Sequence, residues 1–304
     1  MSLTEYKIIS PDGLTQATIV PERGGYVSSL IMPFQSGPRE TLFLYDYARD
    51  EIIDNLPGGI PFVFPICARI SRDGIEGVYL YDGEQYQLNI HGFSWFEKWD
   101  VLSVTENSIE LVLKSNSNTL ISYPFEFEII LKFIIENGKL ECHQIYKNTD
   151  KEKAMPYYAG FHPYFLTPKL NEGKENMALN FHSTRRLKYN ATLTDIVGEQ
   201  FIIKTPVKIT DPEINEQLSI LSDDKCVTLT YPNGEAIKIN AYGIDDFNMF
   251  SYLQLYNIPE KPFFCIEHWM GFPNAMNSVD GVRWLKAGES EEGVYQIECS
   301  EPHR

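Results

Sequence analysis

The clearest segment of the chain, residues 125–136, alternates apolar and polar positions with the period of a β-strand. Every second residue is apolar and belongs to one face, because successive strand side chains point to opposite sides: Phe125, Phe127, Ile129, Leu131, Phe133 and Ile135. The opposite face mixes charged residues with Ile130 and Ile134. A partly apolar second face predicts that something packs on both sides of this strand, which favours stacked sheets over a single open sheet.

Four pairs of segments are joined by turn sequences typical of β-hairpins. Asp-Gly and Asn-Gly dipeptides supply the positive φ angles that tight hairpin turns need. The predicted partners are residues 7–9 with 15–20, 78–81 with 85–88, 125–136 with 139–146, and 228–231 with 236–239.

Helical patterns are few and short. Residues 45–55 are a candidate helix, and residues 211–222 have room for a turn or two. No stretch alternates strands with long helices, which argues against a doubly wound α/β fold. The polar segment 169–174 predicts a surface loop, and we find no repeat and no linker that would divide the chain. The pattern predicts one large, mainly antiparallel all-β domain over residues 1–304.

Charge and cysteine usage narrow the possible partners. The formal net charge of −16 repels phosphate backbones, so nucleic acid is not expected as a partner. A phosphorylated substrate would need a local cluster of Arg or Lys. The five Cys are scattered without a Cys-x-x-Cys pair, and the six His lack metal-ligand spacing, so we expect neither a disulfide framework nor a metal site.

The N-terminal sequence has no signal-peptide pattern. No apolar run approaches the roughly 18 residues of a membrane helix. We therefore expect a cytoplasmic protein that does not enter a membrane. Aromatic residues make up 13% of the chain, which suits strands and also offers surfaces on which sugars stack.

Two segments in the first third of the chain carry candidate chemistry. Residues 56–70 interrupt an apolar run with three prolines and two glycines, which cannot occupy the middle of a sheet. This segment predicts a rigid loop that delivers Arg69, although Arg69 paired with a surface acid is an equally good interpretation. In residues 90–95, His91 precedes a glycine that permits close backbone approach. Taken alone, His91 is more often a structural histidine.

Two later segments supply an acid–base pair. His162 lies in an aromatic cluster, residues 157–165, and Pro163 biases it to extended geometry. A histidine desolvated by aromatic rings titrates near neutrality or below, which suits proton transfer. Taken alone, however, the segment slightly favours a core histidine that donates to a backbone carbonyl. Glu267 interrupts an apolar run and needs a cation or a cleft, because burial without a partner is costly. Arg69 or another base is the alternative, purely structural partner.

These segments together resemble the aldose 1-epimerase (galactose mutarotase-like) superfamily, nearer to its less characterised hexose and hexose-phosphate epimerase branches than to galactose mutarotase proper. The similarity spans residues 58–290 and lies in the following motifs, in order: Gly-Gly-Ile-Pro at 58–61, Pro-Ile-Cys-Ala-Arg at 65–69, His-Gly-Phe at 91–93, Phe-His-Pro-Tyr-Phe at 161–165, Ile-Glu-x-Trp at 266–269, Pro-Asn-Ala-Met-Asn at 273–277 and Leu-Lys-Ala-Gly-Glu-Ser at 285–290. The resemblance implies a β supersandwich without a metal or an organic cofactor.

The resemblance also implies roles for individual residues. His162 matches the general acid and Glu267 the general base, while His91 and Arg69 match residues that orient the sugar's oxygens. Apart from the resemblance, the aromatic residues Trp269 and Phe272 near Glu267 are candidates for stacking on the sugar. A substrate-binding Asp of the galactose enzyme has three candidates here, Asp211, Asp245 and Asp246, and His268 stands where relatives often have proline, a change expected to affect the floor of the pocket.

Mutarotation explains why two such groups are needed. A base takes the proton from the C1 hydroxyl while an acid protonates the ring oxygen, and the ring then closes on the other face. We therefore expect a hexose mutarotase, monomeric or homodimeric, with Glu267 as carboxylate and His162 as imidazolium. One alternative is the same reaction on a hexose 6-phosphate, which Arg69 and Arg72 would hold. The others are a non-catalytic sugar-binding or sensing protein, using Trp95 and Trp269, and a domain of a larger carbohydrate enzyme.

Overall fold

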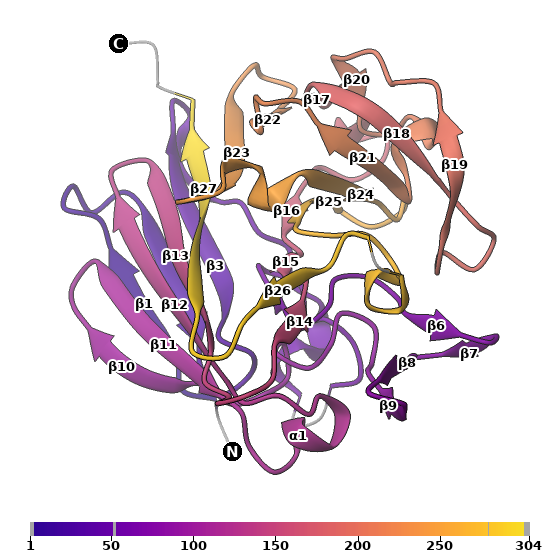
Figure 1. The fold of residues 1–304 in the computed structure, drawn as a ribbon. Helices are drawn as coiled ribbons and strands as arrows, with labels where there is room; N and C mark the ends of the chain where they lie inside the picture. Colours follow the sequence, from indigo (N-terminus) through magenta and orange to yellow (C-terminus); the bar gives the residue numbers. More distant parts are fainter. Residues whose placement is uncertain (1–2, 51–52, 279, 301–304) are drawn as a thin grey trace.

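The structure is a computed structural model that describes residues 3–50, 53–278 and 280–300. Regular structure in these residues is almost entirely antiparallel β, so the predicted all-β class is confirmed (Figure 1). Within the described ranges there is one α-helix, α1 (Thr119–Ser122), and five single turns are 3-10 helices: η1 (Asp46–Arg49), η2 (Lys174–Asn176), η3 (Pro212–Ile214), η4 (Phe247–Phe250) and η5 (Ala275–Asn277). No helix of the described chain is long and apolar enough to cross a membrane.

Two large sheets form the body of the molecule. The nine-stranded sheet contains, in spatial order, β10 (Asp100–Val104), β11 (Ser108–Lys114), β12 (Phe127–Glu136), β13 (Lys139–Asn148), β27 (Ser290–Cys299), β23 (Ala236–Gly243), β22 (Val227–Thr230), β17 (Ala178–Asn180) and β20 (Val207–Lys208). The eight-stranded sheet contains, in order, β19 (Ile196–Gln200), β18 (Ser183–Tyr189), β21 (Gln217–Leu221), β24 (Tyr252–Tyr256), β25 (Phe263–Trp269), β15 (Gly160–Phe161) and β5 (Phe62–Val63), and its eighth strand, β16 (Tyr164–Leu166), also pairs with β25.

Smaller sheets surround these two. An N-terminal sheet contains β1 (Tyr6–Ile9), β2 (Gln16–Val20), β3 (Tyr26–Phe34) and β4 (Gly37–Glu40). Three two-stranded ribbons complete the fold: β6 (Ser71–Arg72) with β7 (Ile75–Glu76), β8 (Val78–Tyr81) with β9 (Glu84–Gln87), and β14 (Met155–Tyr157) with β26 (Arg283–Leu285). All four predicted hairpins are present, as β1–β2, β8–β9, β12–β13 and β22–β23.

Aromatic side chains fill the space between the two large sheets. Phe161 of the eight-stranded sheet packs on Tyr295 of β27 with ring centroids 4.6 Å apart, and Phe62 lies 6.1 Å from Tyr146 of β13. One face of the eight-stranded sheet is therefore covered by the nine-stranded sheet. The opposite face of its central strands is left for the cavity described below.

Three expectations need correction. The apolar face of β12 is fully buried, but Ile130 and Ile134 on its other face are only half-buried and line an open depression, so the described chain does not pack on both sides. The candidate helix 45–55 is only the 3-10 turn η1 in its described residues, and residues 51–52 lie outside the described chain. The segment 211–222 does hold a 3-10 turn, as expected, and continues into strand β21. The segment 169–174 is a surface loop except at Lys174, whose buried ammonium group donates hydrogen bonds to Asn257 and three backbone carbonyls.

Candidate active site

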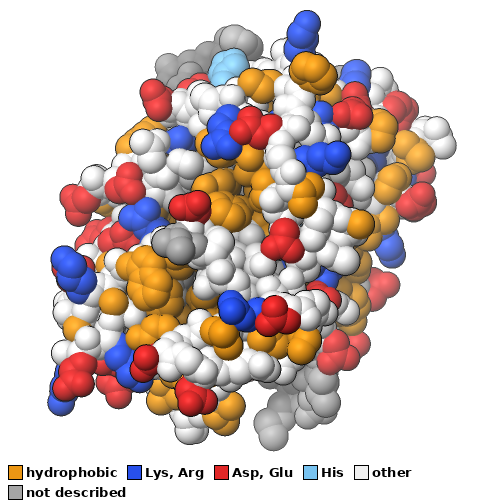
Figure 2. Space-filling model, turned by 45° about the vertical axis from the view of Figure 1, so that its right-hand side comes forward, with side chains coloured by type: hydrophobic (Ala, Val, Ile, Leu, Met, Phe, Trp, Pro, Cys, Tyr) orange, Lys and Arg blue, Asp and Glu red, His pale blue; other side chains and the backbone are white. Residues whose placement is uncertain are grey.

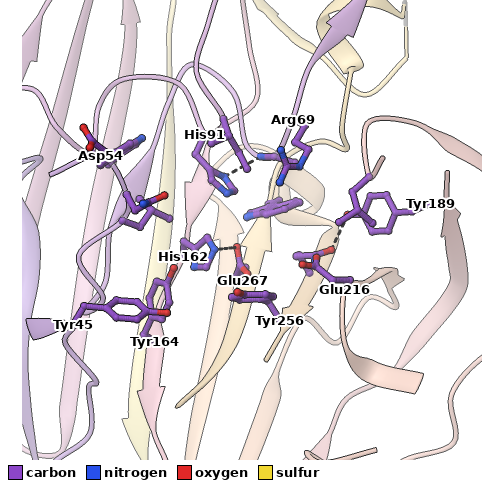
Figure 3. A pocket seen from close by; sticks show the side chains of 18 of the residues that line it. Tyr45, Asp54, Arg69, His91, His162, Tyr164, Tyr189, Glu216, Tyr256 and Glu267 are labelled. Atoms are coloured by element: carbon purple, nitrogen blue, oxygen red, sulfur yellow. Dashed lines mark hydrogen bonds and ion pairs between the residues drawn. The ribbon is translucent and has the colours of Figure 1, made fainter. Parts of the chain in front are cut away.

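A cavity of about 380 Å³ opens on the uncovered face of the eight-stranded sheet. Side chains from nearly every segment singled out in the sequence reach it, together with residues that sequence reasoning missed (Figure 3). The lining residues are Tyr45, Tyr47, Asp54, Asn55, Leu56, Ala68, Arg69, Ile90, His91, Trp95, His162, Tyr164, Tyr189, Leu193, Glu216, Gln254, Tyr256, Glu267 and Trp269.

His162 and Glu267 face each other across two paired segments. Gly160 pairs with Trp269 and Tyr164 pairs with Cys265, so His162 lies midway, opposite Glu267. Side chains directly opposite in an antiparallel pair point to the same face and come into contact. The Nε2 atom of His162 lies 3.4 Å from the Oε2 atom of Glu267 (Figure 3).

The local sequence explains why His162 is free for chemistry. Pro163 divides the pairing with β25 into β15 and β16, and the His162 backbone N–H donates to the Pro61 carbonyl instead. Gly160 lets the two strands approach, since a Cβ atom there would lie 2.5 Å from the Trp269 ring. The bonded core histidine is not observed, because Nδ1 of His162 has no hydrogen-bond partner in the described chain.

Burial pushes both members of the pair toward their neutral forms. Desolvation, aided by the nearby His91, lowers the pKa of His162 well below its ordinary value. Desolvation and the neighbouring Glu216 raise the pKa of Glu267 well above its ordinary value. A hydrogen bond from the Trp269 side chain opposes this rise, and Arg69 pairs with Glu76 rather than with Glu267. Burial therefore favours neutral imidazole and protonated carboxyl, whereas the sequence predicts the charged pair.

A third donor, Cys265, lies beside this pair. One ligand atom from each of His162, Cys265 and Glu267 falls within 4.8 Å of the others, as in a metal site. A metal would need the thiolate and the carboxylate, yet burial raises the pKa of both the Cys265 thiol and Glu267. The residues are therefore a poor fit to a divalent cation, and the absence of a metal stays a prediction. All five thiols are free.

His91 is held as a neutral hydrogen-bond donor. The Ala68 backbone N–H donates to its Nδ1 atom at 3.0 Å, so the ring proton must reside on Nε2. Burial and the Arg69 charge lower its pKa to about 3. The expected close approach at the next residue is confirmed, because a Cβ atom on Gly92 would lie 2.2 Å from the Phe64 carbonyl oxygen.

The sequence allowed Arg69 either to reach a functional site or to pair with a surface acid, and the structure shows both. Arg69 lines the cavity, and its guanidinium also pairs with Glu76 of β7 at 2.5 Å. The Pro-Asn-Ala-Met-Asn segment secures this loop: the Asn274 backbone N–H donates to the Arg69 carbonyl, and the Asn274 side chain accepts from the Ser71 N–H. Asn277 donates to the carbonyls of Ser71 and Val78. The motif thus positions the arginine without entering the cavity.

The polar end of the cavity contains residues that the sequence did not reveal. Gln254 pairs in register with Glu267, and its amide donates to Glu216 at 3.2 Å and accepts from the Tyr189 hydroxyl at 2.7 Å. Burial raises the pKa of Glu216, although Arg69 and the Gln254 bond oppose the shift. Glu216 has a φ of 48° at the edge of a strand. Glu216 reaches the cavity only because β21, β24 and β25 are neighbours in the sheet.

Several sequence candidates take other positions. Trp269 and Trp95 line the cavity, but Arg72 does not and lies 3.7 Å from Asp73 in an exposed ribbon. His268 points to the opposite face of β25 and contacts the Lys225 carbonyl, so it does not alter the cavity floor.

None of the three candidate aspartates is among the lining residues. Asp211 and Asp246 cap 3-10 turns, and Asp245 is exposed. The acid that occupies the polar end is Glu216 instead.

The other end of the cavity is aromatic. The Tyr164 ring stacks on His162 at 4.7 Å and meets the edge of Tyr45 at 5.9 Å, and Tyr45 stacks on Tyr47 at 4.9 Å. The Tyr47 hydroxyl donates to the Leu56 carbonyl, and Asp54 and Asn55 also line the cavity. Figure 3 shows Tyr45 and Tyr164 on one side of the His162–Glu267 pair and Glu216 on the other.

Fold and cavity define a β protein of the galactose mutarotase-like class, and comparisons with known proteins agree. The profile of the family described as aldose 1-epimerase matches residues 8–298, so the chain belongs to the aldose 1-epimerase family.

Two solved structures share its fold. The Slr1438 protein from Synechocystis sp. PCC 6803 is 24% identical with a TM-score of 0.80, covering 98% of this chain and 96% of its own. A galactose mutarotase related enzyme from Lactobacillus acidophilus is 21% identical with a TM-score of 0.80, covering 98% of each chain. In sequence, the chromosomal Protein LacX of Lactococcus lactis subsp. lactis is 24% identical over 234 residues, which are 72% of this chain and 76% of that protein.

Proposed function

We propose that this protein is a mutarotase that interconverts the anomers of a neutral aldohexose, with His162 and Glu267 as its acid–base pair. The observation that carries the proposal is the 3.4 Å approach of these two buried groups at the floor of a cavity. Family membership supports a carbohydrate epimerase, and the cavity chemistry supports the finer assignment.

The reaction moves two protons in opposite directions. In ring opening, carboxylate Glu267 takes the C1 hydroxyl proton while imidazolium His162 protonates the ring oxygen, which breaks the C1–O5 bond. The open-chain aldehyde is then bound beside protonated Glu267 and neutral His162. Rotation about C1–C2 and the reverse transfers close the ring on the other face and restore the charged pair. A positioned acid or base of this kind contributes roughly 10²–10⁴-fold.

Burial of the pair favours this sequence. The charged pair accompanies the cyclic sugar and the neutral pair accompanies the open chain. Because desolvation disfavours both charges, it drives the two protons toward the positions that they occupy after opening. The neutral and charged pairs differ only by one proton passing between Glu267 and His162. The enzyme therefore resets without a cofactor.

The remaining polar residues would hold the sugar's hydroxyls. His91 offers its Nε2–H as a donor, Arg69 offers guanidinium donors, and Glu216 offers acceptor oxygens. Trp269 lies at the cavity wall, where its ring offers an apolar face to the sugar's C–H groups.

The charge of the cavity argues against a hexose 6-phosphate. Among the described lining residues Arg69 is the one cation, and it is already paired with Glu76, while Asp54, Glu216 and Glu267 contribute carboxyl groups. Arg72, the second cation of the phosphate hypothesis, lies outside the lining. Lys and Arg side chains are scattered singly among acids on the face shown in Figure 2.

Polarimetry on glucose and galactose beside glucose 6-phosphate tests this assignment. We expect kcat/KM for at least one free sugar to exceed that for the phosphate by more than tenfold, because a phosphate dianion would enter a cavity without a free cation. A preference for the phosphate would contradict the neutral-sugar assignment. Sugar binding by calorimetry without faster anomer exchange would instead favour a binding or sensing protein.

A further inference from the structure

The cavity is larger than one sugar ring requires. Ligand pockets of roughly 300–1,000 Å³ enclose most of a drug-sized ligand. The cavity measures about 380 Å³. It therefore has room beyond a single ring that lies against His162 and Glu267.

The two ends of the cavity differ in chemistry. Arg69 and Glu216 lie on the Glu267 side, whereas His91 packs against His162 with ring centroids 5.1 Å apart. On the other side of His162, Figure 3 shows Tyr164 and Tyr45. The Tyr164 ring meets the edge of Tyr45, which stacks on Tyr47, and all three rings line the cavity. We call these three rings the tyrosine arm.

The mechanism orients the sugar relative to the tyrosine arm. His162 protonates the ring oxygen and Glu267 contacts the C1 hydroxyl, so C1 and C2 lie toward Glu216 and Arg69. In a pyranose ring the other neighbour of the ring oxygen is C5, which carries C6. The C6 side of the sugar therefore faces Tyr164, Tyr45 and Tyr47.

The arm has the chemistry of a sugar-binding surface. Aromatic rings bind the apolar C–H face of a pyranose, and Asp54 and Asn55, which also line the cavity, offer oxygen and amide partners for its hydroxyl groups. Lys261 lies over the Tyr45 ring, with its Nζ atom 5.9 Å from the ring centroid, but it is not among the lining residues.

We infer that the tyrosine arm is a subsite for a second sugar ring attached through O6, so that (1→6)-linked reducing disaccharides are substrates. This inference rests on the proposed mutarotase function, and it adds the substrate class. A (1→2)-linked disaccharide would direct its second ring into the polar end, where Glu216, Gln254 and Tyr189 are already hydrogen-bonded together.

The test measures anomer exchange by NMR for glucose and galactose, each as free sugar, as its (1→6)-linked reducing disaccharide and as the (1→2)-linked isomer. For the sugar that is turned over, we expect the (1→6)-linked form to match or exceed the free sugar in kcat/KM and to exceed the (1→2)-linked isomer by more than fivefold. Equal or better use of the (1→2)-linked isomer would overturn the subsite while leaving the mutarotase intact. No acceleration for any sugar would overturn the mutarotase itself.

Variants at the arm separate ring stacking from loop structure. Tyr47→Ala is expected to lower the ratio of kcat/KM for the (1→6)-linked disaccharide to that for the free sugar by about tenfold. Tyr47→Phe keeps the ring but loses the hydrogen bond to the Leu56 carbonyl, and it should keep most of the ratio. Phe201→Ala, at a fully exposed ring outside the cavity, is the matched control and should leave the ratio unchanged. An unchanged ratio in Tyr47→Ala, or an equal loss in Tyr47→Phe, would overturn the stacking role.

Discussion

At the scale of single residues, the pair His162 and Glu267 is unusual because both groups are buried and neither has its full set of hydrogen-bond partners. Nδ1 of His162 has no hydrogen-bond partner in the described chain, Nε2 lies 3.4 Å from a Glu267 oxygen, and the Trp269 indole is the neighbouring donor that lowers the Glu267 pKa. Buried polar groups of this kind cost stability unless a ligand completes them. The sugar's C1 hydroxyl and ring oxygen are such partners in the proposed mechanism.

The same pair predicts the pH dependence of the reaction. Catalysis requires one proton on the pair, so activity is lost at low pH when His162 also becomes protonated and at high pH when Glu267 loses its proton. The His162 pKa is lowered and the Glu267 pKa raised by burial. We therefore expect kcat/KM to stay level as pH falls through 6.5 and to decline only below it. Polarimetry corrected for buffer catalysis measures this, and an acid limb centred at 6.5 or higher would contradict the buried pair.

At the scale of elements, the position of Arg69 depends on the turn that contains Asn274. Asn274 adopts a φ of 63°, a conformation that Asn tolerates and Ala disfavours, and its side chain bonds the Ser71 N–H. Asn274→Ala should raise KM severalfold and lower the free energy of unfolding by about 1–2 kcal/mol, because the Arg69 loop loses its support. Kinetics and urea unfolding would measure both effects.

The matched control is Asn171→Ala. Asn171 is exposed, has a φ of 66° and lies outside the cavity, so the backbone strain is reproduced without the loop contacts. Asn171→Ala should lower the free energy of unfolding slightly and leave KM unchanged. An equal rise of KM in the control, or none in Asn274→Ala, would show that the turn does not position Arg69.

Local and long-range elements differ in how far the sequence predicts them. The four hairpins follow from turn dipeptides and alternation, which are local signals, and all four are present. His162 and Glu267 were found by their family motifs, but their contact depends on the register between residues about one hundred positions apart. Glu216 and Gln254 had no motif at all, because only the strand order β21–β24–β25 brings them to the cavity.

At the scale of the whole molecule, a buried histidine makes the free energy of unfolding depend on pH. His268, on the covered face of β25, has a pKa lowered by burial to about 4. Between pH 6.5 and 4 the unfolded chain takes up a proton that the folded protein does not, so the free energy of unfolding falls as pH falls. The loss from this one group amounts to about 3 kcal/mol over that window.

His268→Gln removes the titration while its amide can still donate to the Lys225 carbonyl. We expect the variant's urea-unfolding free energy to depend less steeply on pH between 6.5 and 4 than that of the wild-type protein. His182→Gln, at an exposed histidine, is the matched control. Parallel pH curves for His268→Gln and wild type would mean that His268 does not titrate as its burial implies.

The central claim is that the facing pair His162 and Glu267 transfers the protons of anomer exchange. NMR exchange spectroscopy on the sugar that is turned over, with wild-type protein, His162→Asn and Glu267→Gln, tests it most directly. The account predicts enzymatic exchange for the wild type and a loss of roughly 10²–10⁴-fold for each variant, with sugar still bound. Full rates in either variant that retains its fold would contradict the account.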